Sequence, residues 1–316
     1  MHRRTLLTLA LAAAAAPKTG WTEASDISFQ DIWPGAAPGG EKVTVTEHTV
    51  LRSANPTDTA FLNVTKPWLM LRRPAKPNGG AVLLMPGGGY MRVAVSKAGG
   101  EIDAWLAGLG YTVFTMDYRL PADGWAAGPD VALQDGQRAI RLIRSRAVEL
   151  GFDVNRVAIM GFSAGGHVAG MLATRFAEQS YAPVDAIDAL PARPDVAALM
   201  YPVITMTEPY AHRGSLKQMF GDAPTEAQRL HSSIELHVAA DTPPTFVGGT
   251  TDDPAVPMQN AILIYEALKA AKIPSELHLY EGNTHGFPLR NPEGQLLPWG
   301  PTALAFLQRH GLDKPV

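Results

Sequence analysis

The sequence predicts an α/β fold in which a mostly parallel sheet is flanked by helices on both faces. Six short apolar runs, each ended by turn residues, have the continuous hydrophobic character of strands buried on both faces. Helical patterns fall between these runs, and this alternation implies parallel strands joined by right-handed crossovers. The chain has 316 residues, 46% of them hydrophobic and 18% charged, so it is long enough to bury a large core.

Most elements can be placed by residue number. We expect the buried strands within residues 79–89, 110–120, 156–163, 195–204, 242–253 and 275–286. Helices are expected within residues 99–110, 132–151, 165–179 and 261–274. Residues 42–53 and 61–74 alternate apolar and polar side chains, as half-exposed antiparallel strands do. The Gly-, Pro- and Trp-rich residues 21–40 predict an irregular surface segment.

A segment from Thr205 to Ala240 interrupts the alternation. It is longer than a simple connection between strands and contains at least two helical pieces. We expect a helical insertion near residues 205–240, over the carboxyl ends of the strands, where it could cap a substrate pocket. Residues 25–316 show no internal repeat and no dividing linker, so they are expected to form a single catalytic domain.

The amino terminus has the layout of an export signal. A basic start with His2, Arg3 and Arg4 precedes an apolar stretch that is too short to span a bilayer as a mature helix. We expect residues 1–24 to be a signal peptide and short leader, with cleavage among the alanines or nearer residue 24. The paired arginines are also compatible with twin-arginine export. The protein is therefore expected in the periplasm or outside the cell, with no membrane span in the mature chain.

The composition excludes several classes of function. Lys plus Arg (27) and Asp plus Glu (30) leave a formal net charge of -3 with no long run of one sign, so nucleic acid is not an expected partner. The absence of cysteine excludes disulfides, thiolate catalysis and Cys-ligated metals in this chain. We expect neither a metal nor a cofactor, and the oligomeric state stays open.

Ser163 lies in the stretch Gly161-Phe162-Ser163-Ala164-Gly165, which matches the pattern G-x-S-x-G. A buried strand before it and an amphipathic helix after it supply the context that a nucleophile elbow requires. Glycines on either side leave room for the tight turn, and the helix amino terminus favours negative charge that develops at the serine. We predict that Ser163 is a nucleophile; a passive serine in a glycine-rich turn is the alternative.

A serine hydroxyl needs a base and an orienting carboxylate, which follow in the chain order Ser, acid, His. His285 ends the last predicted strand and is the expected base, because active-site groups gather at the carboxyl ends of parallel strands. Asp253 is the expected acid, with Asp252 as a structural neighbour and Asp241 as a third choice. The remaining histidines from the elbow onward are expected to be packed or solvated: His167, His212, His231, His237, His278 and His310.

The run "LLMPGGGY" predicts a second part of the site. Backbone N–H groups stabilise the oxyanion of acyl transfer, and we expect them from Gly88, Gly89 and Ala164. A phosphate-binding loop is the alternative, but no Gly-Lys-Ser/Thr follows and the spacing is not G-x-G-x-x-G. Tyr90, beside this loop, and Trp125, in "DGWAAGPD", are expected to line the acyl or sugar pocket or to pack as a lid.

The glycine loop, the serine turn and the later acid and histidine follow one another along the chain as they do in the α/β-hydrolase superfamily, which this sequence resembles. Within it the chain is similar to bacterial carbohydrate esterases, namely acetylxylan esterases and the feruloyl-esterase-like domain. The resemblance covers about two hundred residues and is carried by "PGGGY", "MDYRL", "DGQRAIRLIRSRA", "GFSAGGH", "PPTFVGGTTDDPAVP" and "HLYEGNTHGF". Pro86 departs from related lipase-like enzymes, which carry His before the glycines, so bracing of the loop by that side chain is not expected.

The resemblance implies a metal-free serine esterase that works through an acyl-enzyme. O-acetyl groups on xylan-type carbohydrate are the first expected substrate, followed by feruloyl or other small-acyl esters. Two other classes stay open: a prolyl-oligopeptidase-like peptidase, because "GFSAGG" resembles that domain too, and a non-catalytic hydrolase-like binding protein. Asp135, Arg138 and Arg119 lie in the matching stretches and are expected to form internal salt bridges or hydrogen bonds near the elbow.

Overall fold

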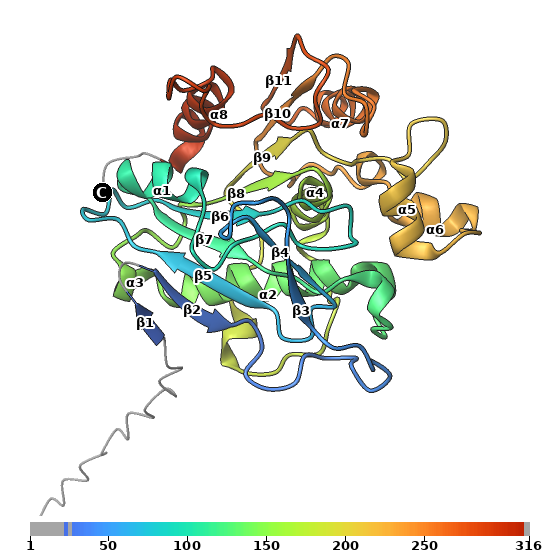
Figure 1. Ribbon diagram of the computed structural model, residues 1–316, viewed down its shortest axis with the longest axis horizontal. Helices are drawn as coiled ribbons and strands as arrows, with labels where there is room; N and C mark the ends of the chain where they lie inside the picture. The colour runs from blue at the N-terminus through green and yellow to red at the C-terminus, as the bar shows by residue number, and fades with distance from the viewer. Residues whose placement is uncertain (1–21, 25–26, 313–316) are drawn as a thin grey trace, which may run out of the picture.

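The structure is a computed structural model that describes residues 22–24 and 27–312 (Figure 1). A nine-stranded sheet forms its centre, with the strands in the order β1-β2-β5-β7-β6-β8-β9-β10-β11. The strands from β7 to β11 in this order are parallel, whereas β1, β2 and β5 add an antiparallel edge. The predicted mostly parallel sheet is therefore confirmed.

The bounds of the elements are as follows. The strands of the large sheet are β1 (Thr22–Ala24), β2 (Ile27–Asp31), β5 (Trp68–Arg72), β6 (Ala81–Met85), β7 (Thr112–Met116), β8 (Val157–Phe162), β9 (Val196–Met200), β10 (Thr245–Thr250) and β11 (Ser275–Tyr280). A two-stranded sheet contains β3 (His48–Leu51) and β4 (Thr59–Leu62). The α-helices are α1 (Glu101–Gly108), α2 (Val131–Ser145), α3 (Ala147–Leu150), α4 (Ala164–Arg175), α5 (Arg213–Phe220), α6 (Glu226–His231), α7 (Gln259–Ala270) and α8 (Trp299–Leu307). Short helical turns are η1 (Pro121–Asp123), η2 (Gly128–Asp130), η3 (Ala186–Ala189), η4 (Ile234–Leu236) and η5 (Gln308–Leu312).

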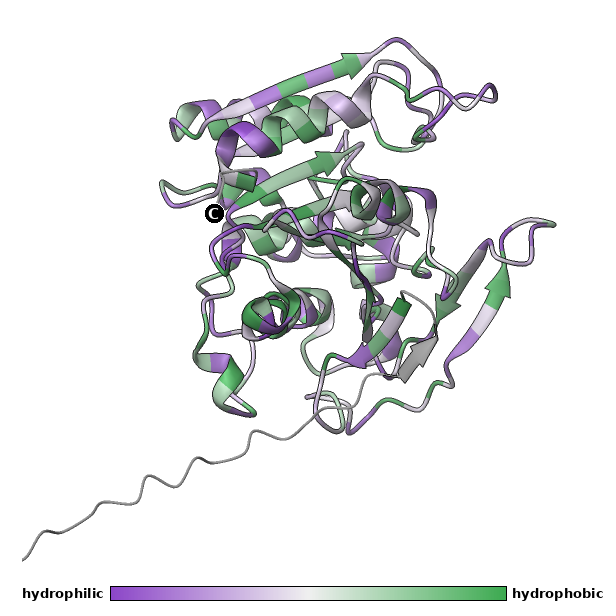
Figure 2. Cartoon of the chain, turned by 90° about the vertical axis from the view of Figure 1, so that its left-hand side faces the viewer, coloured by the Kyte–Doolittle hydropathy of each residue, from purple (hydrophilic) through white to green (hydrophobic). Residues whose placement is uncertain are grey.

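Helices cover both faces of the sheet, which explains the continuous apolar runs. Every residue of β6, β7, β8, β9 and β10 is buried. The expectation of a buried strand is wrong for β11, which is half-buried along its length because it lies at the edge of the sheet. Successive residues Leu83 and Leu84 of β6 belong to different hydrophobic clusters, one packed against α2, α4 and α7 and the other against α1 and α8. Figure 2 shows hydrophobic residues along the inner strands of the sheet. Strands with both faces covered have nearly continuous runs of apolar residues.

The amino-terminal segment differs from its prediction. Residues 21–40 were expected to be irregular, but they contain β1 and β2. Phe29 of β2 is the register partner of Met70 in β5, and burial alternates along β2 as one face packs on the core. The Pro and Gly residues that predicted a loop begin only at Pro34, so they do not interrupt the pairing.

Residues 42–53 form a strand only at His48–Leu51, which is shorter than the alternating pattern predicts. The Glu47 carboxylate accepts hydrogen bonds from the amides of Thr65 (3.0 Å) and Lys66 (3.3 Å). These contacts fix the segment before β3 against the connection between β4 and β5. The side chains alternate in burial as predicted, but the first half of the segment pairs with no strand among the described residues.

The predicted signal and leader, residues 1–24, lie outside the described residues except for Thr22–Ala24, which pair with β2. No helix in the described ranges 22–24 and 27–312 is long and apolar enough to cross a membrane. The export of the protein therefore stays a prediction.

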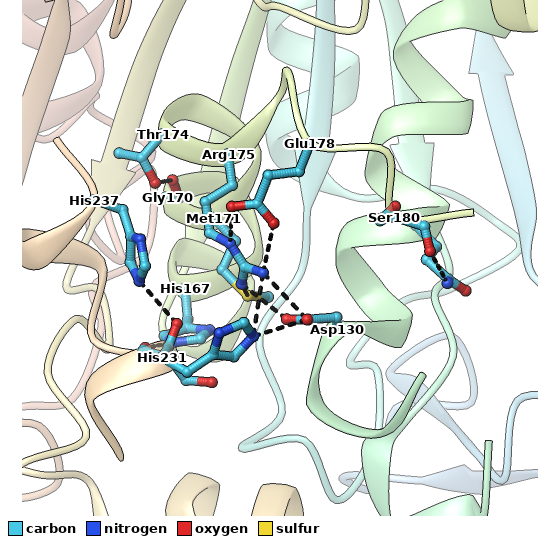
Figure 3. A network of polar contacts seen from close by, with 12 residues as sticks. Asp130, His167, Gly170, Met171, Thr174, Arg175, Glu178, Ser180, His231 and His237 are labelled. Atoms are coloured by element: carbon cyan, nitrogen blue, oxygen red, sulfur yellow. Dashed lines mark hydrogen bonds and ion pairs between the residues drawn. The ribbon is translucent and has the colours of Figure 1, made fainter. Parts of the chain in front are cut away.

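The insertion near residues 205–240 contains α5, α6 and η4, at the edge of the molecule beyond α4 in Figure 1. Asp130, which precedes α2, accepts hydrogen bonds from Arg175 of α4 (2.8 Å) and from His231 of α6 (2.8 Å), as Figure 3 shows. Glu178 binds the same guanidinium at 2.8 Å. The insertion is therefore tied to α2 and α4 by a charged network.

Candidate active site

Ser163 lies at the sharp turn between β8 and α4, with φ of 56° and ψ of -120°. A positive φ is uncommon for a residue with a side chain, so the surrounding backbone must hold this conformation. A methyl group on Gly161 would lie 2.3 Å from the carbonyl oxygen of Gly165, and one on Gly165 would lie 2.1 Å from that of Met85. Close backbone contact therefore requires both glycines of the pattern G-x-S-x-G.

The structure brings Ser163, His285 and Asp253 into one line of hydrogen bonds. The Ser163 hydroxyl oxygen lies 2.7 Å from Nε2 of His285, and Nδ1 of His285 lies 2.8 Å from Oδ2 of Asp253. Because an ionised carboxylate only accepts, Nδ1 carries the proton of the neutral ring. Nε2 then holds the lone pair and accepts the hydrogen bond of the serine hydroxyl.

Asp253 follows β10 in a turn that holds its carboxylate from both sides. Oδ1 accepts hydrogen bonds from the amides of Ala255 (2.8 Å) and Val256 (2.9 Å), while Oδ2 faces His285. Burial raises the pKa of this carboxyl, but the hydrogen bonds from His285 and the two amides outweigh it, so the pKa lies below its ordinary value. Asp253 is therefore ionised at neutral pH.

The alternative carboxylates and one alternative histidine lie elsewhere. Asp252 is exposed, and its carboxylate accepts a hydrogen bond from the hydroxyl of Thr251 (2.9 Å). Asp241 is exposed before β10. His278 lies in β11, the edge strand, where its ring contacts Glu276 at 3.1 Å. None of these side chains lies on the line through Ser163.

The glycine loop, residues 86–90, is held by its carbonyl groups. The Tyr118 hydroxyl donates to the Pro86 carbonyl (2.7 Å), and the Ala94 amide donates to the Gly87 carbonyl (2.8 Å). The Gly88 carbonyl accepts from two amides of the following turn, at 3.2 and 3.3 Å. Pro86 offers no side-chain donor, and the Tyr118 hydroxyl braces the loop in its place.

With the carbonyls of Pro86, Gly87 and Gly88 bound, the glycine loop leaves amide groups beside Ser163. A methyl group on Gly87 would lie 3.0 Å from Cβ of Ser163, so the loop passes directly over the serine. Gly88 and Gly89 have φ of 144° and 64°, and their amides donate to no group in the described part of the chain. Ala164 is the first residue of α4, where an amide has no partner inside the helix.

Tyr90 does not line the cavity, because it is fully buried beneath the glycine loop. Its hydroxyl lies 2.7 Å from Nδ1 of His167, whose Nε2 lies 2.8 Å from the carbonyl oxygen of Ser232. A carbonyl only accepts, so Nε2 carries the proton and Nδ1 accepts from the tyrosine. Burial lowers the pKa of His167 to about 4, and the neutral ring links the loop, α4 and the insertion.

Trp125 is also outside the cavity wall, so its predicted place there is corrected. It is buried, with the Arg119 guanidinium 4.6 Å from its ring centre. Arg119 is paired with Asp135 at 2.8 Å, and Arg138 is paired with Asp185 at 2.5 Å. The internal salt bridges expected for these arginines are therefore present, and Trp125 packs against one of them.

A cavity of about 960 Å³ opens at Ser163 and His285. Its apolar and aromatic lining includes Leu84, Ile102, Phe162, Tyr201, Phe287 and Leu289. Its polar lining includes Arg52, Asn55, Thr57 and Asp58, from the connection between β3 and β4. His212 of the insertion also lines the cavity, which the sequence did not reveal; the only signal was its place in a segment expected to cap a pocket. Among the described residues, no group of three or more His, Asp or Glu side chains is arranged to hold a metal ion.

Comparison with known proteins adds three relatives and a family. The BD-FAE family matches residues 69–268. An endo-1,4-beta-xylanase B of Butyrivibrio fibrisolvens is 34% identical over 213 residues, which are 67% of this chain and 33% of that protein. An acetylxylan esterase of Xylanibacter ruminicola is 29% identical over 221 residues, 68% of this chain and 42% of that protein. The crystal structure of an acetyl ester-xyloside bifunctional hydrolase from Caldicellulosiruptor lactoaceticus is 29% identical, covers 91% of this chain and 97% of its own, and has a TM-score of 0.71.

The fold and these matches define the structural class as the α/β-hydrolase fold, and the matching proteins include ones named as ester hydrolases. Within this class, the chain belongs to the BD-FAE family, whose match covers more than half of its length. The chain spans about a third of the xylanase and less than half of the acetylxylan esterase. The activities of those longer proteins therefore enter only as proposals for this chain.

Proposed function

We propose that this protein is a serine esterase that hydrolyses carboxylic esters through Ser163, His285 and Asp253. The observation that carries the proposal is the continuous line of hydrogen bonds, 2.7 Å from the serine hydroxyl to Nε2 and 2.8 Å from Nδ1 to the carboxylate. The strained turn at the serine adds support, because it places a hydroxyl in the cavity wall at the amino terminus of a helix.

In the proposed reaction, the Ser163 hydroxyl oxygen attacks the ester carbonyl while its proton passes to Nε2 of His285. Asp253 stays ionised and stabilises the imidazolium through Nδ1. The imidazolium then gives its Nε2 proton to the leaving alcohol, and an acyl-enzyme remains on the serine oxygen. Water attacks this acyl group with His285 again as base, which releases the carboxylic acid and restores the serine hydroxyl.

The proposed oxyanion hole consists of the amides of Gly88, Gly89 and Ala164. Support comes from the loop that crosses Ser163 with its carbonyls bound elsewhere, since its free amides cost no reorganisation when negative charge develops. Loss of one such donor typically costs on the order of a hundredfold in kcat.

O-acetyl groups on xylan-type carbohydrate are the proposed substrate. The names of the acetylxylan esterase and the acetyl ester-xyloside hydrolase support the acyl group and the sugar. The cavity also supports it, because about 960 Å³ is far more space than an acetyl group needs and part of the lining is polar. Feruloyl esters are a second candidate, favoured by the aromatic rings of Phe162, Tyr201 and Phe287 in the same cavity.

We also propose that the protein is exported as one catalytic domain, residues 25–316. The basic start and short apolar stretch of residues 1–24 support this proposal. Fractionation of producing cells, with amino-terminal sequencing of the recovered protein, tests both the location and the cleavage site. An uncleaved chain confined to the cytoplasm would contradict it.

The nucleophile is tested by Ser163→Ala. We expect the variant to lose turnover of p-nitrophenyl acetate and labelling by a fluorophosphonate probe while its circular dichroism stays that of the folded protein. Activity near that of the unchanged protein would overturn the assignment. Acetate and ferulate release from acetylated xylan, acetylated monosaccharides and feruloylated oligosaccharides then identifies the acyl group, and amine release from a proline-linked peptide would instead indicate a peptidase.

A further inference from the structure

His212 is a half-buried histidine in the wall of the cavity, immediately before α5 of the insertion. Its Nδ1 accepts a hydrogen bond from the amide of Ser215 (3.1 Å) and lies 2.8 Å from the hydroxyl of the same residue. A backbone amide can only donate, so Nδ1 holds a lone pair. The proton of the neutral ring is therefore on Nε2.

The ring of His212 stays neutral near neutral pH and offers one hydrogen-bond donor. Burial lowers its pKa below the ordinary value, and the positive form of His285 lowers it further, while Asp253 acts in the opposite direction. Nε2 makes no hydrogen bond to any residue in the described part of the chain. The helix cap thus occupies one ring nitrogen, and the other remains available to a ligand.

The position of His212 indicates which part of a substrate it meets. Its Cε1 lies 3.8 Å from the point that a Cβ on Gly89 would occupy, so the ring borders the glycine loop. Its pKa also responds to the charges of His285 and Asp253, which places it within electrostatic range of the proposed base. The base must deliver its proton to the leaving alcohol, so the alcohol occupies this side of the cavity.

We infer that Nε2–H of His212 donates a hydrogen bond to a hydroxyl next to the esterified oxygen, so that His212 selects esters of sugars and other polyols. This inference rests on the proposed esterase function and deepens it by naming the residue that recognises the alcohol. Capping alone does not explain a histidine here, because Asn, Asp and Ser are the ordinary caps. A histidine supplies the cap with one nitrogen and a donor to the cavity with the other.

Three variants separate the cap from the donor. His212→Asn keeps a side-chain acceptor for the Ser215 amide but is too short to replace Nε2, His212→Gln carries an N–H at about that reach, and His212→Ala has neither. Thr225→Ala is the matched control, because Thr225 caps α6 of the same insertion through the Gln228 amide (3.2 Å) and does not line the cavity.

The substrates are 2-hydroxyethyl acetate and propyl acetate, two esters of similar size of which only the first has a neighbouring hydroxyl. We expect the unchanged protein and Thr225→Ala to favour 2-hydroxyethyl acetate by about fivefold in kcat/KM, mainly through KM, as one neutral hydrogen bond provides. His212→Asn and His212→Ala should bring the ratio near one, and His212→Gln should restore part of it. The melting temperature should depend on the helix cap instead, so it should fall in His212→Ala and change little in His212→Asn.

The outcomes are distinguishable from those for the proposed function. Two results would overturn the inference and leave the esterase proposal standing. The unchanged protein could hydrolyse both esters with no preference, or His212→Asn could keep the preference of the unchanged protein. An equal loss of kcat/KM on both esters in His212→Asn would also overturn the inference, because His212 would then affect the acyl group or the fold and not the neighbouring hydroxyl. If neither ester is hydrolysed, the esterase proposal fails and the inference fails with it.

Discussion

The carboxylates of Asp252 and Asp253 are neighbours in the chain but meet different surroundings. Asp252 is exposed and accepts a hydrogen bond from the hydroxyl of Thr251. The Asp253 side chain is 2% exposed and faces His285. Hydrogen bonds to the ionised form keep the pKa of Asp253 low despite its burial, so its charge persists wherever a histidine base is neutral. Of the two carboxylates, only that of Asp253 contacts the imidazole that we propose as the base.

We therefore expect Asp253→Asn to lower kcat for p-nitrophenyl acetate by about 10³- to 10⁴-fold, because the amide can donate to Nδ1 and favour the wrong tautomer of His285. The matched control, Asp252→Asn, should stay within about twofold of the unchanged protein, since surface changes away from a site have small effects. Comparable losses in the two variants would contradict the assignment of the acid. Steady-state kinetics on both proteins is sufficient.

The glycine loop, α4 and the insertion are three elements joined by one buried chain of hydrogen bonds. Tyr90 extends from the loop, His167 belongs to α4, and Ser232 follows α6. Tyr90 has φ of 60°, an uncommon backbone conformation at the point where the loop turns inward. The Tyr90 side chain therefore anchors the loop that carries Gly88 and Gly89, although it does not touch the cavity.

The prediction for this chain of contacts is that Tyr90→Phe affects both stability and rate. Removing the hydroxyl leaves Nδ1 of His167 buried without a donor, which typically costs about 1–3 kcal/mol of unfolding free energy. A loosened oxyanion loop should also lower kcat on the order of tenfold. Urea unfolding and steady-state kinetics measure the two effects.

Tyr181→Phe is the matched control for Tyr90→Phe. The Tyr181 hydroxyl donates to Asp188 at 2.5 Å, and the ring does not line the cavity. This variant should lose stability without a change in kcat. If Tyr90→Phe likewise keeps its kcat, then the tyrosine supports the fold but does not position the loop.

The stability of the whole protein should depend on pH through His167. Burial lowers its folded pKa to about 4, whereas the unfolded value is about 6.5. Between these values the unfolded chain binds a proton that the folded protein does not, so folding stability falls as the pH falls. The contribution of this group is at its full value above about pH 6.5 and is lost on the way down to about pH 4.

We expect this single group to remove about 2–3 kcal/mol of unfolding free energy between pH 7 and pH 4.5. His167→Gln has no titrating ring, so its unfolding free energy should fall by about 2–3 kcal/mol less than that of the unchanged protein over the same pH range. This difference is expected even if the variant is less stable at pH 7. Urea unfolding of both proteins at pH 7, 5.5 and 4.5 measures the difference. Parallel pH profiles would show that the ring is protonated in the folded protein.

Much of the architecture could be predicted because it depends on local patterns. The six predicted strands appear as short apolar runs, and each of them lies in the parallel part of the sheet, although β11 at the edge is only half-buried. The elbow is recognised from a local pattern, because a side chain on Gly161 would meet Gly165 four residues further on. The close contact of Gly165 with Met85 of β6 exists only in the folded chain. The strands β1 and β2 were missed because β2 pairs with β5, which lies some forty residues away in the chain, and β1 pairs only with β2.

The sequence by itself determined the alternation of the parallel strands with helices, the turn that holds Ser163 and the chain order of the proposed acid and base, because periodicity and turn patterns are properties of nearby residues. Tertiary structure decided which aspartate faces His285, 122 residues beyond Ser163. It also decided that Tyr90 and Trp125 are buried supports and that His212 borders the cavity. The physical reason is that the surroundings of a side chain are set by distant segments packed against it, which no local pattern contains.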